Sequence, residues 1–418
     1  MIKKLIFKLF LIISATTSLF AETASIDIEK SALNLVKIAV ESYAMPGVTE
    51  FEKTQIDAMF LNDLKVSDRL EAVANPFKNG YETPVTAAEM QSKGIELLIK
   101  YKITKTQNGL SAEYKLFDPQ KNAPLMQRFT VSSFTEYPFL SHNMTVSIND
   151  YLRAPSIDWM KNFVILAKDM GAKKSDIVIA DYTLTYQKTI IHGGYNIFPK
   201  WAGNSQKEFY YTAYENEPTL YKYDIYSGKK TRIMSSDGMI MCSDVSADGK
   251  KLLITKPSGG LPDVFMYEPI LSKLTNLTRY SGIDVNGNFI ENDTKIAFVS
   301  DRLGYPTVFT KALNSDNVEQ LIFSPRYNSS FNAQGELLTY VAREGGEANL
   351  YLMNTKSGQK RQITFAGYNS SPRLSKAGDA IMFFKNDHRK TYLGIFRLNS
   401  FSVYLFPMNI GKIKSLDW

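Results

Sequence analysis

The side chains that most often do chemistry are scarce in this sequence. It has three histidines, His142, His192 and His388, in separate parts of the chain, and a single cysteine, Cys242. A structural or catalytic zinc site needs several Cys or His ligands at short spacings, and the sequence contains neither a His-x-x-x-His segment nor a pair of cysteines. We therefore predict no metal ion and no cofactor, and we expect each histidine to be a surface or capping residue.

The sequence also lacks the usual signs of nucleophilic catalysis. Cys242 could act as a nucleophile, but no histidine lies near it in the sequence, so we favour a small buried core residue. A serine nucleophile on a strand-to-helix turn requires Gly-x-Ser-x-Gly, whereas Gly109-Leu110-Ser111 is followed by Glu113 in place of the second glycine. These residues predict a protein that is not an enzyme.

The second half of the chain repeats a β-type segment at a regular interval. The spacings between successive copies are 46, 43, 44, 41 and 44 residues, and one four-stranded propeller blade takes about 40 to 45 residues. Each copy is followed by two further β-type runs, with turn residues between them. This pattern predicts a six-bladed β-propeller over residues 159–418. The copies begin at Phe163, Phe209, Leu252, Ile296, Leu337 and Ile381.

The two ends of the predicted propeller complement each other. In the middle units another strand precedes the repeated segment, as Phe198–Trp201 does before Phe209, but Pro155–Asp158 before Phe163 does not read as a strand. The last residues of the chain, Ser415–Trp418, resemble Phe198–Trp201. We infer that the C-terminus supplies the inner strand of the first blade, which closes the ring and removes a free sheet edge.

Tyrosines precede several predicted inner strands at close to the blade spacing. They should gather at one end of the ring, where binding surfaces rich in aromatic residues are favoured. A partner-binding rim and simple packing both remain open as interpretations. The tyrosines are Tyr195, Tyr280, Tyr327 and Tyr368.

Residues 22–158 have a different pattern, which mixes helical and strand signals. Ala32–Tyr43 fits either a strand or a helix, and Leu97–Thr104 and Ser111–Phe117 flank Asn108-Gly109, a strong hairpin signal. The mixture predicts an α+β domain before the propeller. Three segments have apolar residues near helical spacing: Glu50–Leu64, Ala87–Leu98 and Leu140–Arg153.

The first residues have the layout of a secretory signal peptide. Met1–Lys4 is positively charged, Leu5–Leu19 is mostly apolar, and Ala21 supplies a small residue at the cleavage point. An uncleaved anchor is the alternative, but the apolar run is short and is interrupted by Lys8. We therefore predict a signal peptide over residues 1–21 and a mature periplasmic chain with no membrane span.

The charge of the chain gives little reason to expect a nucleic-acid partner. Removal of the predicted signal peptide lowers the formal net charge from +7 to +4. The remaining Lys and Arg residues are scattered and form no long basic block. We predict no nucleic-acid binding.

Several of these segments resemble the TolB family, the periplasmic propeller proteins of the Tol-Pal system. Asn349–Asn354 and Ser357–Thr364 are similar to the blade signature of the family, and Lys295–Arg302 is similar to its other half. The family's usual Trp-Ser-Pro-Asp-Gly stands here only as altered copies such as Val245–Gly249. The resemblance runs over essentially all of the mature chain and implies a protein-binding scaffold that serves outer-membrane integrity and cell division.

The resemblance also implies partners and the surfaces that bind them. It implies a bridge between the peptidoglycan-associated lipoprotein Pal and the inner-membrane protein TolA, with other outer-membrane or peptidoglycan-associated proteins as further partners. The alternative is a propeller hydrolase or lyase acting on envelope glycans or peptides, because enzymes often use this fold. The positions implied for Pal are Met239, Ile240, Met241, Cys242, Asp284, Val285, Asn328, Ser329, Asn369 and Ser370. The positions implied for TolA, at the mature N-terminus, are Glu22, Thr23, Ala24, Ser25, Ile26, Asp27 and Ile28.

Overall fold

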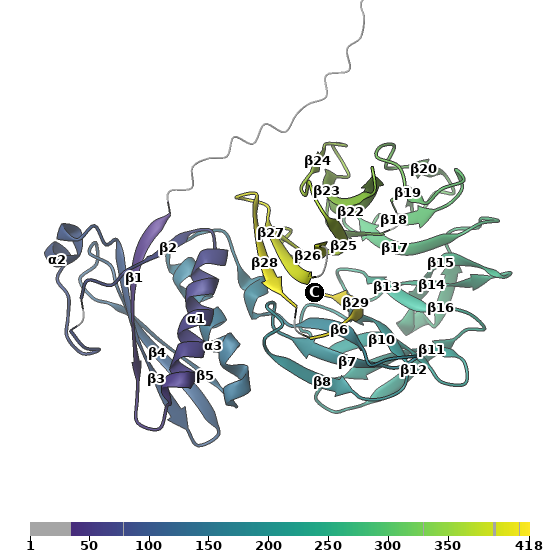
Figure 1. The fold of residues 1–418 in the computed structure, drawn as a ribbon. Helices are drawn as coiled ribbons and strands as arrows, with labels where there is room; N and C mark the ends of the chain where they lie inside the picture. Colours follow the sequence, from purple (N-terminus) through teal and green to yellow (C-terminus); the bar gives the residue numbers. More distant parts are fainter. Residues whose placement is uncertain (1–34, 78, 329, 388–389, 409) are drawn as a thin grey trace, which may run out of the picture.

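A small α/β domain precedes a six-bladed β-propeller in the described part of the chain (Figure 1). This architecture confirms the fold class predicted from the sequence. The predicted signal peptide lies outside the described residues, and the predicted domain limits, 22–158 and 159–418, remain predictions. The computed structural model describes residues 35–77, 79–328, 330–387, 390–408 and 410–418.

The N-terminal domain is one mixed sheet with two of its helices on the face toward the propeller. The strands lie in the order β2-β1-β3-β4-β5, and β1 pairs in parallel with both β2 and β3. Helices α1 and α3 stand between this sheet and the propeller (Figure 1), and their apolar residues form one core with the sheet. The elements are β1 (Val36–Ala44), α1 (Glu50–Val66), β2 (Leu70–Val73), α2 (Ala87–Ser92), β3 (Leu97–Thr106), β4 (Gly109–Phe117), β5 (Leu125–Val131), η1 (Phe134–Glu136) and α3 (Tyr137–Tyr151).

Local sequence explains where α1 begins. Thr49 caps the helix with a capping box, because its side chain accepts a hydrogen bond from the Glu52 N–H while the Glu52 carboxylate accepts one from the Thr49 N–H. The predictions of helices at Glu50–Leu64 and Leu140–Arg153 are confirmed, with ends shifted by a few residues.

Two other expectations for this domain need correction. The predicted helix Ala87–Leu98 ends at Ser92, because Gly94 adopts a φ of +66° and a β-strand starts at Leu97. The predicted hairpin is present, but Gly109 pairs with Thr106 as the first residue of β4, so the turn residues lie one position earlier than expected.

Each propeller blade has four antiparallel strands, and the repeated segments found in the sequence are their second strands. The third and fourth strands also match the β-type runs predicted to follow each repeat. From the inner to the outer strand, the blades of the described chain are blade 1, β29 (Ile413–Asp417), β6 (Val164–Asp169), β7 (Ser175–Ala180) and β8 (Gln187–Ile191); blade 2, β9 (Asn196–Trp201), β10 (Glu208–Tyr214), β11 (Pro218–Asp224) and β12 (Lys230–Ser235); blade 3, β13 (Met241–Val245), β14 (Leu252–Ser258), β15 (Leu261–Glu268) and β16 (Lys273–Asn276); blade 4, β17 (Asp284–Ile290), β18 (Lys295–Ser300), β19 (Thr307–Ala312) and β20 (Val318–Gln320); blade 5, β21 (Ser330–Gln334), β22 (Leu337–Glu344), β23 (Glu347–Asn354) and β24 (Lys360–Gln362); and blade 6, β25 (Tyr368–Leu374), β26 (Ala380–Asp387), β27 (Lys390–Arg397) and β28 (Ser402–Pro407).

The C-terminal strand closes the ring. Strand β29 pairs antiparallel with β6, with Leu416 opposite Leu166. The chain enters the propeller through the short helix η2 (Asp158–Lys161), and Trp159 of η2 packs on Trp418 with ring centroids 5.3 Å apart. The inference that the last residues of the chain form the inner strand of the first blade is confirmed by this pairing.

The propeller has two ends with different loops. At one end, here called the connection end, the chain passes from the outer strand of one blade to the inner strand of the next. The hairpins between second and third strands lie at the same end, because neighbouring strands alternate in direction. The opposite end, here called the C-terminal end, carries Trp418 and the short helix η3 (Pro269–Leu271), and its loops from blades 1 and 6 contact the N-terminal domain.

Candidate functional site

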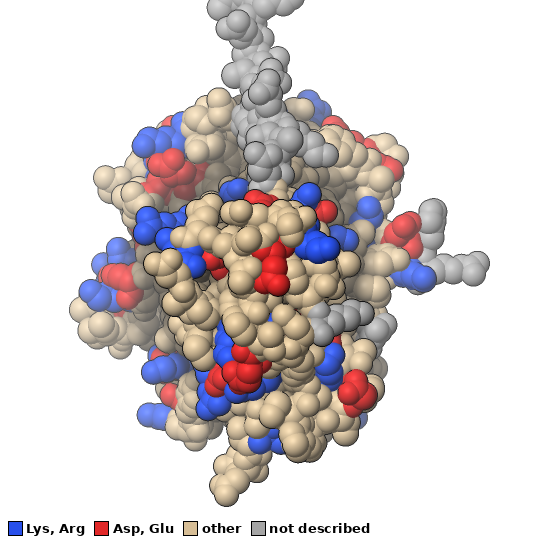
Figure 2. All heavy atoms as spheres, turned by 90° about the vertical axis from the view of Figure 1, so that its left-hand side faces the viewer, with Lys and Arg blue, Asp and Glu red and all other residues tan. Residues whose placement is uncertain are grey.

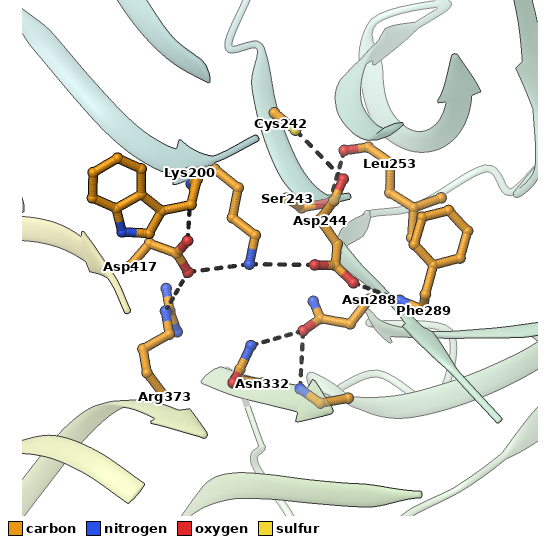
Figure 3. A network of polar contacts seen from close by, with 12 residues as sticks. Lys200, Cys242, Ser243, Asp244, Leu253, Asn288, Phe289, Asn332, Arg373 and Asp417 are labelled. Atoms are coloured by element: carbon orange, nitrogen blue, oxygen red, sulfur yellow. Dashed lines mark hydrogen bonds and ion pairs between the residues drawn. The ribbon is translucent and has the colours of Figure 1, made fainter. Parts of the chain in front are cut away.

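A ring of polar side chains, one from each inner strand of the described blades, surrounds the propeller axis (Figure 3). Successive members are 44 residues apart, except for a step of 41 residues between blades 5 and 6. We call this set the axial ring: Lys200, Asp244, Asn288, Asn332, Arg373 and Asp417.

The acidic and amide members of the axial ring join neighbouring blades. Each accepts a hydrogen bond from a main-chain N–H of the next inner strand, a group that the blade's own ladder leaves free. These bonds run from Trp201 to Asp417 (3.0 Å), from Phe289 to Asp244 (2.9 Å), from Ala333 to Asn288 (3.0 Å) and from Leu374 to Asn332 (2.8 Å).

The two basic members of the axial ring have no acceptor atom in their side chains, so they contact the neighbouring blades as donors. Lys200 Nζ lies 3.1 Å from Asp417 Oδ1 and 3.3 Å from Asp244 Oδ1, and Arg373 Nε donates to the Leu416 carbonyl at 3.0 Å. Burial opposes the charge of Lys200, but the carboxylates of Asp417 and Asp244 outweigh this effect and raise its pKa. The two cations and two carboxylates of the axial ring therefore neutralise each other. These contacts hold neighbouring blades together, and the ring offers no free acid or base for proton exchange with a substrate.

A second repeated position lies four residues before each member of the axial ring. Where it holds asparagine, the side-chain amide donates to main-chain carbonyls of the preceding connection, as Asn369 does to Ala366 (3.2 Å) and Asn328 does to Pro325 (2.7 Å). In blade 4 it is Asp284, a fully buried side chain that receives two hydrogen bonds from Arg302, at 3.0 and 3.2 Å. We call these positions, 196, 240, 284, 328, 369 and 413, the anchor positions.

This geometry changes the interpretation of the residues implied for Pal. Asp284, Asn328 and Asn369 are anchor residues that fix the connections from beneath, and their side chains are buried rather than presented to a partner. Ile240 is also a buried anchor residue, and Cys242 is buried beside it, as the core interpretation predicted.

The other implied positions lie nearer the surface. Met239 is exposed, while Met241, Val285 and Ser370 are half-buried. Ser329 lies outside the described residues, as do all the positions implied for TolA, Glu22–Ile28. Binding by any of these residues remains a prediction.

Exposed apolar side chains gather at the connection end over blades 3 to 6, and apart from two tyrosines the sequence did not reveal them. Phe323 and Phe365 are the most exposed of them, at 68% and 73%. Lys360 Nζ donates to the Ser324 carbonyl, which ties the Phe323 connection to blade 5. We call this set the apolar arc: Met239, Leu261, Ile283, Leu303, Phe323, Tyr327, Phe365 and Tyr368.

The predicted tyrosine rim belongs partly to this arc. Tyr327 stands against Tyr305 with ring centroids 5.5 Å apart, and the guanidinium of Arg343 lies 5.3 Å from the centre of the Tyr368 ring. Tyr195, in contrast, packs on a neighbouring tyrosine of blade 2. The rim is therefore exposed over blades 5 and 6 and more fully packed over blade 2.

The domain interface corrects the expectation for His142, which is fully buried rather than at the surface. Its Nδ1 lies 2.8 Å from Asp63 Oδ2 of α1 and its Nε2 lies 3.3 Å from Asp181 Oδ2 of blade 1. The Tyr182 hydroxyl also donates to Asp63, at 2.6 Å. Burial disfavours the imidazolium, but the two carboxylates raise the pKa of His142 to about 9. A single charged histidine therefore joins the two domains.

A second contact reinforces this interface. Asp68, just after α1, accepts hydrogen bonds from Ser400 and Tyr404 of blade 6 and lies 3.5 Å from Arg397 Nε. His192 is an exposed residue paired with Asp176, as expected for a surface histidine, and His388 lies outside the described residues.

The described residues show little that would support other chemistry. Among them, no cluster of three or more His, Cys, Asp and Glu side chains is placed to hold a metal ion, and no helix is long and apolar enough to cross a membrane. On the face formed by the N-terminal domain, basic and acidic side chains are interspersed (Figure 2).

Comparison with known proteins gives matches to both domains. The model of the TolB amino-terminal domain matches residues 24–125, and the model of the TolB beta propeller domain matches residues 161–418. The chain is 40% identical over 411 residues to the Tol-Pal system protein TolB of Wolinella succinogenes, covering 96% of this chain and 97% of the relative. It is 41% identical over 407 residues to the protein of that name from Campylobacter jejuni strain RM1221, with the same coverage.

Solved structures agree in fold. The crystal structure of TolB from Acinetobacter baumannii superposes with a TM-score of 0.76, at 20% sequence identity, and covers 92% of this chain and 96% of its own. The likeness therefore extends across both domains.

Proposed function

The chain belongs to the TolB family, and from that premise we propose that it is a non-catalytic periplasmic scaffold that binds the lipoprotein Pal at the connection end of its propeller. We further propose that residues 22–28 bind the inner-membrane protein TolA, so that one molecule links the two partners. Its matched relatives are named as Tol-Pal system proteins, which supports a role in outer-membrane integrity and cell division.

The apolar arc is the observation that carries this proposal. Phe323 and Phe365 stand in adjacent connections, and both expose most of their side chain. Large exposed apolar groups that gather on one face mark interaction sites, and aromatic residues and arginines contribute most of the binding energy at such sites. The arc carries arginine as well, because Arg343 lies over Tyr368.

The anchor residues give the arc a fixed shape. Asn328 and Asn369 bond to main-chain carbonyls of their own connections, and Asp284 holds Arg302 beneath the blade 4 connection. Loops that are already ordered lose little conformational entropy on binding, and this raises affinity. The buried positions implied for Pal would thus act by positioning the exposed ones.

Isothermal titration of the mature chain with the soluble domain of Pal tests the proposal. The double variant Phe323→Ala/Phe365→Ala should weaken binding at least tenfold, which corresponds to about 1.4 kcal/mol or more. The matched control is Ile270→Ala/Leu271→Ala in η3, which removes two apolar side chains exposed by 81% and 66% at the C-terminal end. Equal affinities for the two double variants would refute docking at the connection end.

Binding to TolA is tested separately with the same protein. A chain that begins at residue 29 should lose affinity for the periplasmic domain of TolA and retain affinity for Pal. Unchanged TolA binding by the shortened chain would remove residues 22–28 from the proposal.

A further inference from the structure

A cavity of about 820 Å³ opens at the connection end, between blade 6 and the segment that leads into the closing strand β29. Its walls come from both sides of this seam, because Ser370, Asn386 and Tyr392 belong to blade 6 while Lys412 directly precedes β29. A volume of this size lies in the range of small-molecule sites, about 300 to 1,000 Å³.

The cavity exists because the last connection lacks a polar anchor. At anchor positions 196, 328 and 369 an asparagine amide reaches under the connection and bonds to main-chain carbonyls. The corresponding residue here is Ile413, whose side chain packs against the core beneath. Ile240 also lacks a polar group, but its connection is closed by Gly238, which lies so near the Pro257 ring that a Cβ would come within 2.7 Å of it.

The described lining is basic and rich in hydrogen-bonding groups. It includes Lys390 and Lys412 and no acidic residue, and neither lysine forms an ion pair within the described chain. The nearby carboxylate of Asp169 is paired with Lys414, at 3.2 Å. Two lysines therefore bring positive charge to the cavity lining, and Asp169 also interacts with the charge of Lys412.

The uncharged lining residues also have hydrogen-bonding groups that no described residue occupies. Asn386 Oδ1 accepts from the Thr391 hydroxyl at 2.7 Å, and the amide nitrogen of Asn386 has no partner among the described residues. The Ser370 hydroxyl likewise has none in the described part of the chain. The Tyr392 side chain adds an aromatic ring to these donors and acceptors.

We propose that this cavity binds a carboxylate-bearing sugar unit of a glycan. The lysines supply charge-assisted hydrogen bonds for the carboxylate, Ser370 and Asn386 can pair with sugar hydroxyl or amide groups, and Tyr392 offers an apolar ring face. A bound sugar would touch blade 6 and the closing segment at once, and so would stabilise the closed ring.

Titration calorimetry and thermal unfolding of the mature chain test this site with a matched pair of sugars. N-acetylmuramic acid carries a carboxylate that N-acetylglucosamine lacks, and inorganic phosphate supplies an anion without a sugar. We expect N-acetylmuramic acid to bind at least tenfold more tightly than either of the others and to raise the unfolding temperature.

Variants at the two lysines complete the test. Lys390→Gln/Lys412→Gln should weaken binding of N-acetylmuramic acid at least tenfold, while Lys121→Gln/Lys229→Gln, which removes the same charge at exposed positions elsewhere, should leave it unchanged. Both lysines of the site are exposed, so unfolding curves without ligand should match the parent protein. Equal binding of the two sugars, equal binding of phosphate, no binding, or full binding by the site variant would overturn the proposal. None of these results would alter the test with Phe323 and Phe365.

Discussion

Replacement of Lys200 by methionine should sharply destabilise the propeller. Methionine has a similar length but no charge, so Lys200→Met would leave Asp244 and Asp417 without the ammonium that lies 3.3 and 3.1 Å from them. Arg373 Nε, 3.8 Å from Asp417, would remain as the one cation beside two carboxylates. Removal of one partner from a buried ion pair costs about 3 to 5 kcal/mol, and we expect a loss of that size in the free energy of unfolding.

Urea unfolding followed by tryptophan fluorescence measures this loss at the relevant place. The sequence has three tryptophans, Trp159, Trp201 and Trp418, and all of them lie at the seam between the first two blades and the closing strand. Their emission therefore reports on the closure of the ring.

Two further variants separate the charge effect from the loss of a side chain. Lys222→Met removes one partner of a partly exposed pair with Glu208, 2.7 Å apart, and should cost about 0 to 1 kcal/mol. In Lys200→Met/Asp244→Asn the uncompensated carboxylate is also removed, so part of the lost stability should return. If Lys200→Met proved no more destabilising than Lys222→Met, the idea that the axial ring holds the blades together would be refuted.

Two other predictions concern stability. His142 has a pKa raised to about 9, whereas an unfolded histidine titrates near about 6.5, so the folded state holds more protons than the unfolded state between these two values. The stabilisation by His142 is therefore complete below about pH 6.5 and is lost as the pH rises through about 9. The unfolding temperature should fall over this range in the parent protein and in His192→Gln, but not in His142→Gln. A parallel fall in the unfolding temperature of all three proteins would contradict this prediction. Charge reversal at Asp284 should lower the free energy of unfolding by about 3 kcal/mol or more, because Arg302 would lose its buried partner. The urea midpoint should fall accordingly, and an unchanged midpoint would show that the pair is not needed for folding.

The repeat could be predicted from the sequence because each blade carries the same local signals. Strand-forming residues and turns recur at a fixed interval, and Ser415–Trp418 matches Phe198–Trp201 because Asp417 and Lys200 occupy equivalent places in the axial ring. The axial ring itself could have been found in the same way, since its polar members recur every 44 residues over the three steps from Lys200 to Asn332.

The other features of the candidate site and the domain interface depend on contacts between distant residues, which local sequence patterns do not contain. The family resemblance implied Asp284 and Asn369 as positions that bind Pal, but both side chains are buried because they bond to groups distant in the sequence. His142 is buried only because the propeller supplies Asp181 against α3. The apolar arc was missed for a similar reason, because exposed Phe323 and Phe365 cannot be told from core residues by type alone.

Hydrogen exchange of the mature chain with and without Pal tests the central claim most directly. If Pal docks on the apolar arc, its addition should slow exchange in the connections around Met239, Ile283, Phe323 and Phe365. Exchange around Ile270 at the opposite end should not change. Protection confined to the C-terminal end, or no protection at saturating Pal, would contradict the proposed docking surface.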